Sequence, residues 1–449
     1  MLLRFHLARR LLGAKLRHTR RTLMNIMVLG SGGREAALAQ KLNESESCDE
    51  LYCVPGNGGT ALFANNVADV DPCDGAAVVA FASEHGVELV VVGPEAPLVA
   101  GVADAVRAAG IACFGPGAQG AQMEGSKEFA KKLMAKYDIP TAAYASFTSL
   151  EPAEEYIKEQ GAPIVIKADG LAAGKGVTVA TTVEQAVEAV RDCFDGAFGD
   201  AGASVVIEEC MTGPECSIMG ITDGKTVLCC QPAQDHKRAY DGDEGPNTGG
   251  MGVYSPVPIV TPEEQAAMTK IMEQTVTALA AEGIDYRGCL YGGFMLTPTG
   301  PRVVEFNARF GDPETQVLMP RLESDLVDVM MAVDAGKLED VQLQWTDAFC
   351  VGVVLASDGY PGSYEKRKPV TGIEAAEQNG AHVYHAGTVV DGGQLLTNGG
   401  RVFCVSALGS TFQEARDKAY EACDKVSFSN KFMRSDIGAR ALRGREAWD

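Results

Sequence analysis

Tryptophan and histidine are scarce in this chain, and long apolar runs are missing. The 449 residues include 2 Trp and 6 His. No apolar stretch approaches the ~20 residues that a membrane-spanning helix needs, so no membrane association is expected. With 39 Lys and Arg against 60 Asp and Glu, the net charge is −21, so binding of nucleic acid is not expected either. Local lysines and backbone N–H groups must therefore hold any small anionic ligand.

Paired cysteine motifs are also absent. The 13 cysteines are an odd and scattered set without a C-x-x-C pair, and Cys229 and Cys230 are adjacent. This usage predicts reduced thiols in a cytosol-like compartment. His382 and His385, in "HVYH", have no further His or Cys nearby, so a zinc site is not expected.

Acidic residues are missing from the start of the chain, where Glu35 is the first. Residues 1–21 carry seven Lys or Arg interleaved with Leu, which is typical of an organelle transit segment. The alternative is an unused upstream start, because Met24 and Met27 stand just before the first expected strand. We expect a mitochondrial matrix or plastid stroma location if the segment is used, and a cytoplasmic one otherwise.

The length and the 46% hydrophobic content are enough for two to four domains. The first would be a small parallel α/β domain, because "NIMVLGSGGREAALAQKL" (25–42) has the pattern of a strand, a glycine turn and a helix. Further strands are expected in 86–98, which ends in a Pro-rich turn, and in 110–117. Glu35 stands where a dinucleotide fingerprint needs its third glycine, so NAD binding is weakly supported. Anion binding at the helix start remains plausible.

The remaining chain indicates α/β and α+β elements. Residues 126–160 read as helices, and capped amphipathic helices are expected at 181–194 and 261–283, the latter with Met268, Met272 and Leu279 in the core. Beyond about 345 the pattern changes to short strands with one late helix at 411–423. The expected division is a presequence at 1–24, an N-terminal α/β domain at 25–124, a central domain at 125–344 with a subdomain at about 146–210, and a C-terminal α+β domain at 345–449.

A glycine-rich stretch, "VIKADGLAAGKGV" (165–177), has the composition of a phosphate-binding loop. It is not a P-loop, because three residues rather than four separate Gly170 and Gly174, and Gly176 follows Lys175 where a hydroxyl is required. The following β-branched alternation predicts a strand, so the stretch is a strand–loop–strand hairpin. Its backbone N–H groups could close over phosphates. The alternative is a long hairpin loop without a ligand.

A second stretch, "RVVEFNARFGDPETQ" (302–316), begins with an apolar strand. Glu305 and Asn307 are two residues apart, so both side chains project from one face, roughly 7 Å apart. A carboxylate and an amide oxygen so placed can hold Mg²⁺ that also binds nucleotide phosphates. A structural salt bridge would give a similar pattern.

The order of these features resembles an ATP-grasp domain: a lysine strand, a glycine hairpin, a strand ending in "EE" (208–209) and E-x-N on a late strand. Further strings narrow the resemblance over residues 25–440 to the phosphoribosylamine–glycine ligases, also called glycinamide ribonucleotide synthetases. They are "GSK" (125–127), "GPEAPL" (93–98), "DHKR" (235–238), "GPNTGGMG" (245–252), "NARFGDPETQ" (307–316) and "TNGGRV" (397–402).

This resemblance implies a pre-ATP-grasp N-terminal domain, an ATP-grasp domain with a glycine-rich lid hairpin, and a small C-terminal α+β domain. It implies ATP-dependent ligation of glycine to 5-phosphoribosylamine, giving glycinamide ribonucleotide, ADP and phosphate through glycyl phosphate. That reaction is the second step of de novo IMP synthesis. It implies Mg²⁺ or Mn²⁺ as cofactor, small-molecule partners only, and a monomer or weak dimer.

The resemblance also implies roles for individual residues. Lys127 and Lys167 would contact ATP phosphates, under a lid at 169–177 that includes Gly170, Gly174, Lys175 and Gly176. Glu208, Glu209 and Cys210 would lie beside adenine, Glu215 would bind the ribose, and Glu305 and Asn307 would bind the metal. Near the reacting carboxylate and amine would lie Lys237, Arg238, Arg309 and Asp312, with Asp235, Thr248, Gly249, Gly250, Met251, Gly32 and Gly33 as substrate-binding residues.

Two departures from the family pattern matter. Ala36 replaces the usual His of "GGREHAL". If that His contacts substrate, the replacement alters substrate affinity. If that His only packs, the replacement changes nothing. The strand "CLYGGFML" lacks the extra metal ligand of many ATP-grasp proteins, which argues against the biotin-carboxylase branch. The rival interpretations are another ATP-grasp ligase or carboxylase, a nucleotide-binding protein without catalysis, and a dinucleotide-dependent oxidoreductase.

Overall fold

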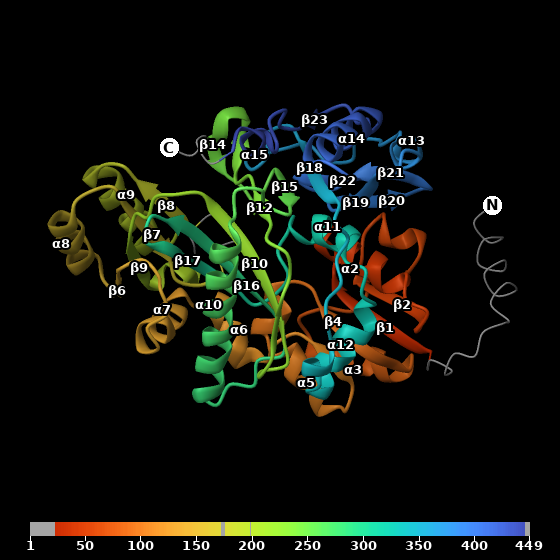
Figure 1. Ribbon diagram of the computed structural model, residues 1–449, viewed down its shortest axis with the longest axis horizontal. Coiled ribbons are helices and arrows are strands. Elements are labelled where there is room, and N and C mark those ends of the chain that lie inside the picture. The colour runs from red at the N-terminus through yellow and green to blue at the C-terminus, as the bar shows by residue number, and fades with distance from the viewer. Residues whose placement is uncertain (1–22, 172–175, 198, 445–449) are drawn as a thin grey trace, which may run out of the picture.

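The computed structural model describes residues 23–171, 176–197 and 199–444. Figure 1 shows the N-terminal sheet and the C-terminal elements stacked on one side of the molecule, with a smaller subdomain projecting from the other. The basic segment 1–22 and the hairpin residues Gly174 and Lys175 lie outside the described residues. None of the helices in the described part of the chain is long and apolar enough to cross a membrane.

The N-terminal region is a parallel five-stranded sheet in the order β3-β2-β1-β4-β5. The order of the strands reverses at β1, with β2 on one side of it and β4 on the other, so the turns after β1 and β4 lie at the point of the carboxyl edge where such sheets bind ligands. The "GPEAPL" segment is a short helix instead of the expected turn, because a proline is tolerated in the first helical turn. The elements are β1 (Met24–Gly30), α2 (Gly33–Asn43), β2 (Cys48–Pro55), β3 (Asn65–Asn66), α3 (Gly75–Glu84), β4 (Val87–Val92), α4 (Glu95–Val99), α5 (Val102–Ala108), β5 (Ala112–Phe114) and α6 (Ala118–Gly125).

The projecting subdomain, which we call the lid subdomain, is a four-stranded sheet in the order β6-β9-β7-β8 covered by two helices. β7 and β8 pair antiparallel, which confirms the strand–loop–strand prediction for the glycine-rich stretch. The expectation of helices throughout 126–160 was wrong, because β6 interrupts them. Its four residues pair with β9, and this tertiary pairing outweighs local helix propensity. The elements are α7 (Lys127–Lys136), β6 (Tyr144–Phe147), α8 (Leu150–Gln160), β7 (Ile164–Ala168), β8 (Val177–Ala180), α9 (Val183–Phe194) and β9 (Val205–Glu209).

A second four-stranded sheet, β11-β10-β16-β17, forms the body of the central region and packs against α10. The predicted capping box of α10 is confirmed: the Thr261 hydroxyl accepts from the Glu264 N–H, and the Glu264 carboxylate accepts from the Thr261 N–H. Met268, Met272 and Leu279 are buried as expected. The elements are β10 (Glu215–Thr222), β11 (Val227–Cys229), α10 (Pro262–Ala281), β16 (Gly288–Thr297), β17 (Gly300–Asn307), α11 (Thr315–Leu318) and α12 (Leu326–Ala335).

The C-terminal sheet draws strands from two distant parts of the chain. β12 and β15, from the central region, pair with each other, and β15 pairs with β18 from beyond the boundary expected at residue 345. α14 packs on β18 and β22. The elements are β12 (Gln234–Asp235), the hairpin β13 (Arg238–Tyr240) and β14 (Glu244–Asn247), β15 (Gly252–Ser255), β18 (Phe349–Ser357), α13 (Ile373–Glu377), β19 (His382–His385), β20 (Thr388–Asp391), β21 (Gln394–Thr397), β22 (Arg401–Gly409), α14 (Phe412–Lys425), β23 (Lys431–Phe432) and α15 (Ala439–Arg443).

Candidate active site

A cavity of about 940 Å³ lies where the lid subdomain, the central sheet, the N-terminal sheet and the C-terminal sheet meet. Its wall gathers residues that are far apart in the sequence, and it includes most of the positions singled out from the motifs. Gly32, Gly33, Gly250 and Met251 are not on the wall. Those on it are Lys127, Lys167, Gly170, Gly176, Glu208, Glu209, Cys210, Glu215, Asp235, Lys237, Arg238, Thr248, Gly249, Glu305, Asn307, Arg309 and Asp312.

One end of the cavity holds a buried cluster of two lysines on one carboxylate. Glu208, at the end of β9, accepts from Lys167 on β7 at 2.9 Å and from Lys131 on α7 at 3.2 Å. Lys167 also donates to the Val304 carbonyl at 2.9 Å, which ties the lid subdomain to β17. Burial lowers the pKa of Lys131 to about 8, although Glu208 opposes this. Two cations facing one carboxylate leave positive charge available for an anionic ligand.

Lys127 begins α7 at the mouth of the hairpin. Its ammonium donates to the Gly170 carbonyl at 2.9 Å, and the Ser126 hydroxyl before it caps α7. Gly170 has φ of +116°, a conformation that a residue with a Cβ rarely adopts. The described ends of the hairpin, at Gly170 and Gly176, therefore start beside Lys127 and Lys167.

The predicted nucleotide-binding glutamates have protein partners. Glu209 accepts from Arg302 at 3.0 Å and from the Ala143 N–H at 3.2 Å, which joins β9, β17 and the chain entering β6. Glu215 lies 2.9 Å from Lys237, and this carboxylate raises the pKa of Lys237 well above its ordinary value against the effect of burial. The structure thus pairs two residues to which the family resemblance assigns separate roles.

The E-x-N residues project from β17 into the same cavity. Among the described residues, the Glu305 carboxylate has no hydrogen bond and no ion pair. Burial raises the pKa of Glu305, but Lys237, Lys167 and Lys127 together lower it below its ordinary value. Asn307 donates from Nδ2 to the Phe306 carbonyl at 3.0 Å, and within the described chain its Oδ1 accepts no hydrogen bond.

These two oxygen donors fit a hard divalent cation. Mg²⁺ is typically bound through one or two protein oxygens together with substrate phosphates, and both Glu305 and Asn307 offer an oxygen that has no partner in the part of the chain that the structure describes. The described residues contain no group of three or more His, Cys, Asp and Glu that could hold a metal ion. The two protein oxygens therefore match an ion that takes its remaining ligands from a nucleotide.

Arg309 is clamped between two acids that the sequence analysis did not assign. Its guanidinium lies 2.6 Å from Glu124 on α6 and 3.4 Å from Glu95 on α4. Glu124 also accepts from the Ala308 N–H at 2.8 Å. Burial raises the pKa of Glu124 despite Arg309. This cluster joins the N-terminal sheet to the loop after β17.

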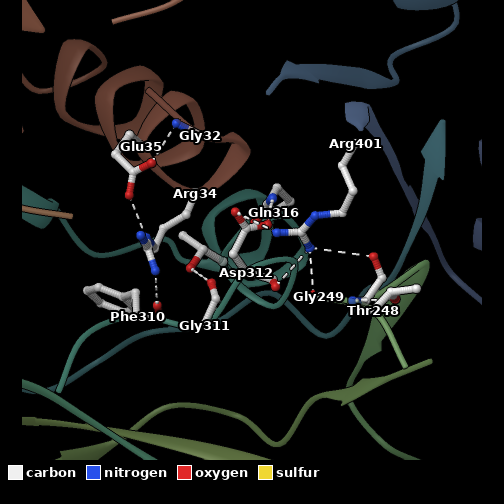
Figure 2. A network of polar contacts seen from close by, with 12 residues as sticks. Gly32, Arg34, Glu35, Thr248, Gly249, Phe310, Gly311, Asp312, Gln316 and Arg401 are labelled. Atoms are coloured by element: carbon white, nitrogen blue, oxygen red, sulfur yellow. Dashed lines mark hydrogen bonds and ion pairs between the residues drawn. The ribbon is translucent and has the colours of Figure 1, made fainter. Parts of the chain in front are cut away.

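At the opposite end of the cavity, Asp312 meets an arginine from the C-terminal sheet. Arg401 lies 3.3 Å from the Asp312 carboxylate, and Gln316 donates to that carboxylate at 2.7 Å (Figure 2). Arg34, from the first turn of α2, donates to the Phe310 carbonyl at 3.2 Å. Burial raises the pKa of Asp312, but the nearby guanidinium groups lower it below its ordinary value, that of Arg401 more than that of Arg34.

The glycine turn after β1 closes tightly instead of opening onto the cavity. The Gly32 N–H donates to the Glu35 carboxylate at 2.7 Å, so this helix-start donor is already satisfied. A Cβ on Gly33 would lie 2.6 Å from the Gln316 amide nitrogen, so a side chain there would displace the end of Gln316. Ala36 is buried and is not on the cavity wall, which favours packing over substrate contact for this position.

The motif residues around the 248–251 turn contribute mainly through their backbone. Met251 is fully buried, and its N–H donates to the His236 carbonyl at 2.8 Å. Gly250 has φ of +109°, and a Cβ there would lie 2.5 Å from Pro313. Asp235, at the end of β12, precedes this turn in the sequence. Burial raises the pKa of its carboxyl to about 7, although Lys237 opposes this.

Several wall residues were missed by sequence reasoning. Lys131 had a usable signal, since it lies one helical turn after Lys127, and Arg401 lies inside the "TNGGRV" string. Four others stand inside strings quoted in the sequence analysis but received no role there: Arg34, Glu95, Tyr291 and Glu314. The last three carry no local pattern and reach the wall only through the fold: Glu124, Tyr360 and Arg440.

Family models match the chain in three consecutive stretches. The phosphoribosylglycinamide synthetase N domain matches residues 24–124, the ATP-grasp (A) domain of the same name matches 125–315, and the C domain matches 350–440. A phosphoribosylamine–glycine ligase of Agrobacterium fabrum is 52% identical over 425 residues, covering 94% of this chain and 100% of that protein. One of Vibrio cholerae is 51% identical over 429 residues, with 94% and 100% coverage.

Solved structures give the same result at the level of the fold. The crystal structure of a phosphoribosylamine–glycine ligase from Thermotoga maritima has a TM-score of 0.82 at 35% identity and covers 92% of this chain and 100% of that one. The biotin carboxylase domain of the Hydrogenobacter thermophilus 2-oxoglutarate carboxylase, solved with MgADP, ADP and bicarbonate, has a TM-score of 0.71 at 16% identity and covers 92% of each chain. The second likeness shows the fold alone.

Proposed function

The chain belongs to the phosphoribosylglycinamide synthetase family and has phosphoribosylamine–glycine ligase activity, and we propose that the cavity described above is where that reaction takes place. The activity is a step of purine biosynthesis that uses ATP. The substrates would be glycine, 5-phosphoribosylamine and ATP, and the products glycinamide ribonucleotide, ADP and phosphate.

One observation carries the assignment of the site. The Glu305 carboxylate faces the cavity without a hydrogen bond among the described residues, and Lys127, Lys167 and Lys237 all act on it electrostatically. A lone carboxylate among three lysines is suited to a polyphosphate with a bound cation, because the lysines offset phosphate charge and the carboxylate holds the cation.

The chemistry requires activation of a carboxylate, because its oxygen is a poor leaving group. Transfer of the γ-phosphoryl group of ATP to a glycine oxygen gives glycyl phosphate and ADP. The amine of 5-phosphoribosylamine then attacks the carbonyl carbon, the new C–N bond forms, the C–O bond to phosphate breaks, and the nitrogen loses a proton. This sequence needs charge compensation and positioning rather than a nucleophilic side chain.

The chain's own residues divide between the two ends of the cavity. Lys127 and Lys167 would bind phosphate oxygens, while the described hairpin ends would bring backbone N–H groups over them. The chain from Glu208 to Cys210 would lie beside adenine through its backbone, since the Glu208 carboxylate is held by two lysines, and Glu215 would bind the ribose hydroxyls. The residues near the reacting carboxylate and amine would be Lys237, Arg238, Arg309 and Asp312, together with Asp235 and the 248–251 turn.

Glu305 and Asn307 would hold Mg²⁺ or Mn²⁺, and the bound ion would supply charge compensation to the phosphoryl oxygens. Because Lys237, Lys167 and Lys127 keep the Glu305 pKa low, this side chain is an ionised ligand at neutral pH. The protein would thus offer the same ligand throughout the neutral pH range.

We expect ADP formation only when glycine, phosphoribosylamine generated in situ and a divalent metal are all present. The measurement is coupled ADP release with each component omitted in turn. Turnover with bicarbonate in place of glycine, at an equal rate, would contradict the proposal and favour a carboxylase of the same fold.

We also propose that the basic segment over residues 1–24 is a transit sequence, and its lack of Ser favours mitochondria over plastids. Fusing residues 1–24 to a fluorescent protein is expected to direct it to an organelle, and a purely cytoplasmic signal would contradict this.

We also propose that the protein is a monomer or a weak dimer, which sedimentation at several protein concentrations would check.

A further inference from the structure

The turn at residues 248–250 is held from the C-terminal sheet by a single arginine side chain. Arg401, the first residue of β22, donates from Nη1 to the Gly249 carbonyl at 2.6 Å and to the Asp312 carbonyl at 3.0 Å. Its other terminal nitrogen lies 3.3 Å from the Asp312 carboxylate. Figure 2 shows the guanidinium lying between the turn and the loop that carries Asp312. One planar group therefore connects two segments of the proposed site.

A second contact, from the turn after β18, holds the same residues. The Tyr360 hydroxyl accepts from the Gly249 N–H at 3.1 Å. A Cβ on Gly249 would lie 3.1 Å from the Arg401 guanidinium carbon, and a Cβ on Gly400 would lie 2.2 Å from the Tyr360 ring. A side chain at position 400 would therefore collide with the tyrosine ring, and one at position 249 would require the guanidinium to shift by a few tenths of an ångström.

Asp312 is fixed from both of its oxygens. Gln316 donates to Oδ1 at 2.7 Å, and Arg401 faces Oδ2. The hydrogen bonds and ion pair described for the Arg401 side chain all go to residues 249, 250 and 312, and none goes to the lysines or glutamates at the nucleotide end. The effect of Arg401 should therefore be confined to the end of the cavity opposite Lys127 and Lys167.

We propose that Arg401 is a positioning residue for the amine substrate: it fixes the 248–250 turn and the Asp312 carboxylate relative to each other. This inference rests on the proposed function, in which both segments lie near the reacting carboxylate and amine, and it assigns them to the amine. Arg401 itself needs no contact with substrate. A guanidinium suits this task better than an ammonium, because its planar fork reaches a carbonyl and a carboxylate at the same time.

The test compares Arg401→Met with Arg401→Lys in the full chain. For Arg401→Met we expect kcat/KM for phosphoribosylamine to fall about 10²-fold, since misplacement by an ångström has effects of that size. The KM for ATP and the affinity for ADP should stay within about twofold of wild type. Arg401→Lys, which keeps the charge but not the fork, should recover part of the loss.

Arg416→Met is the matched control for a purely structural arginine. Arg416 donates to the Ile437 and Ser435 carbonyls at 2.8 Å each, within the C-terminal region, and is not on the cavity wall. This variant should lower Tm and leave every KM unchanged. If Arg401→Met behaves in the same way, or raises the KM for ATP as much as that for phosphoribosylamine, the positioning role is wrong.

Amide hydrogen exchange separates this inference from the proposed function. Arg401→Met should speed exchange of the Gly249 and Gly250 N–H groups, whereas Arg416→Met should not. An active Arg401 variant with unchanged exchange at these amides contradicts the inference and leaves the function intact. A wild-type chain without glycine- and phosphoribosylamine-dependent ADP release contradicts the function.

Discussion

Glu305→Gln is expected to lower kcat by about 10²–10³, the usual effect of losing one contact to developing charge in a transition state. The change keeps the shape of the side chain and removes only its charge. Since the Glu305 carboxylate has no hydrogen bond among the described residues, no protein partner loses a bond. Tm should therefore change little. The measurements are kcat and Tm on one preparation, at saturating and at limiting Mg²⁺.

Two further variants sharpen this test. Asn307→Asp keeps an oxygen ligand and adds charge, so metal affinity should survive while kcat changes through altered geometry. The same Glu→Gln change at the exposed Glu263, in the first turn of α10, should leave kcat unchanged. A Glu305→Gln enzyme with normal turnover at limiting metal would place the metal site elsewhere. A lowered Tm with normal turnover would indicate a structural ion pair instead.

Lys167→Met is expected to lower kcat by about 10²–10³ and to raise the KM for ATP, because it removes a phosphate-binding donor from a buried site. The fold should tolerate the change. Glu208 keeps Lys131 at 3.2 Å, so the carboxylate is not left alone. Removing Lys131 and Lys167 together would leave it without a cation, which typically costs about 3–5 kcal/mol for a buried pair.

The comparison therefore uses both single variants, the double variant and Lys132→Met. Lys132 is exposed on the same helix as Lys131, and its one ion pair among the described residues is with Glu128 at 2.8 Å, so its loss should affect neither kcat nor Tm. Chemical denaturation gives the stabilities, and steady-state kinetics gives kcat and the KM for ATP. If Lys167→Met keeps kcat within about threefold of wild type, the phosphate-binding role is wrong.

Elements with strong local signals were predictable from the sequence. The helices α9, α10 and α14 have capping residues that accept from the first-turn N–H groups, and β17 has its apolar alternation. β6 was not predictable, because its four residues form a strand only where β9 offers a pairing partner. Local chemistry decides the first group, and tertiary pairing decides the second.

The candidate site divides in the same way. Residues inside continuous motifs, such as Lys167 and Glu305, could be found because their neighbours mark a strand and a loop. Contacts between distant parts of the chain could not be found. Glu124 reaches Arg309 across 185 positions of the chain, and Arg401 reaches Asp312 across 89. No periodicity or spacing in one sequence reports such contacts, because only the assembled sheets bring them together.

The C-terminal sheet can be completed only late in the synthesis of the chain. β12 and β15 leave the ribosome well before β18, the strand that pairs with β15, and before β22 and β19 beyond it. During that interval β15 presents an unpaired edge, which is a template for association with other chains. The two halves of this sheet also cannot be produced as separate fragments without leaving such an edge on each. Dividing the gene between residues 255 and 349 should therefore give aggregation-prone pieces, whereas co-expression of both pieces could restore the pairing.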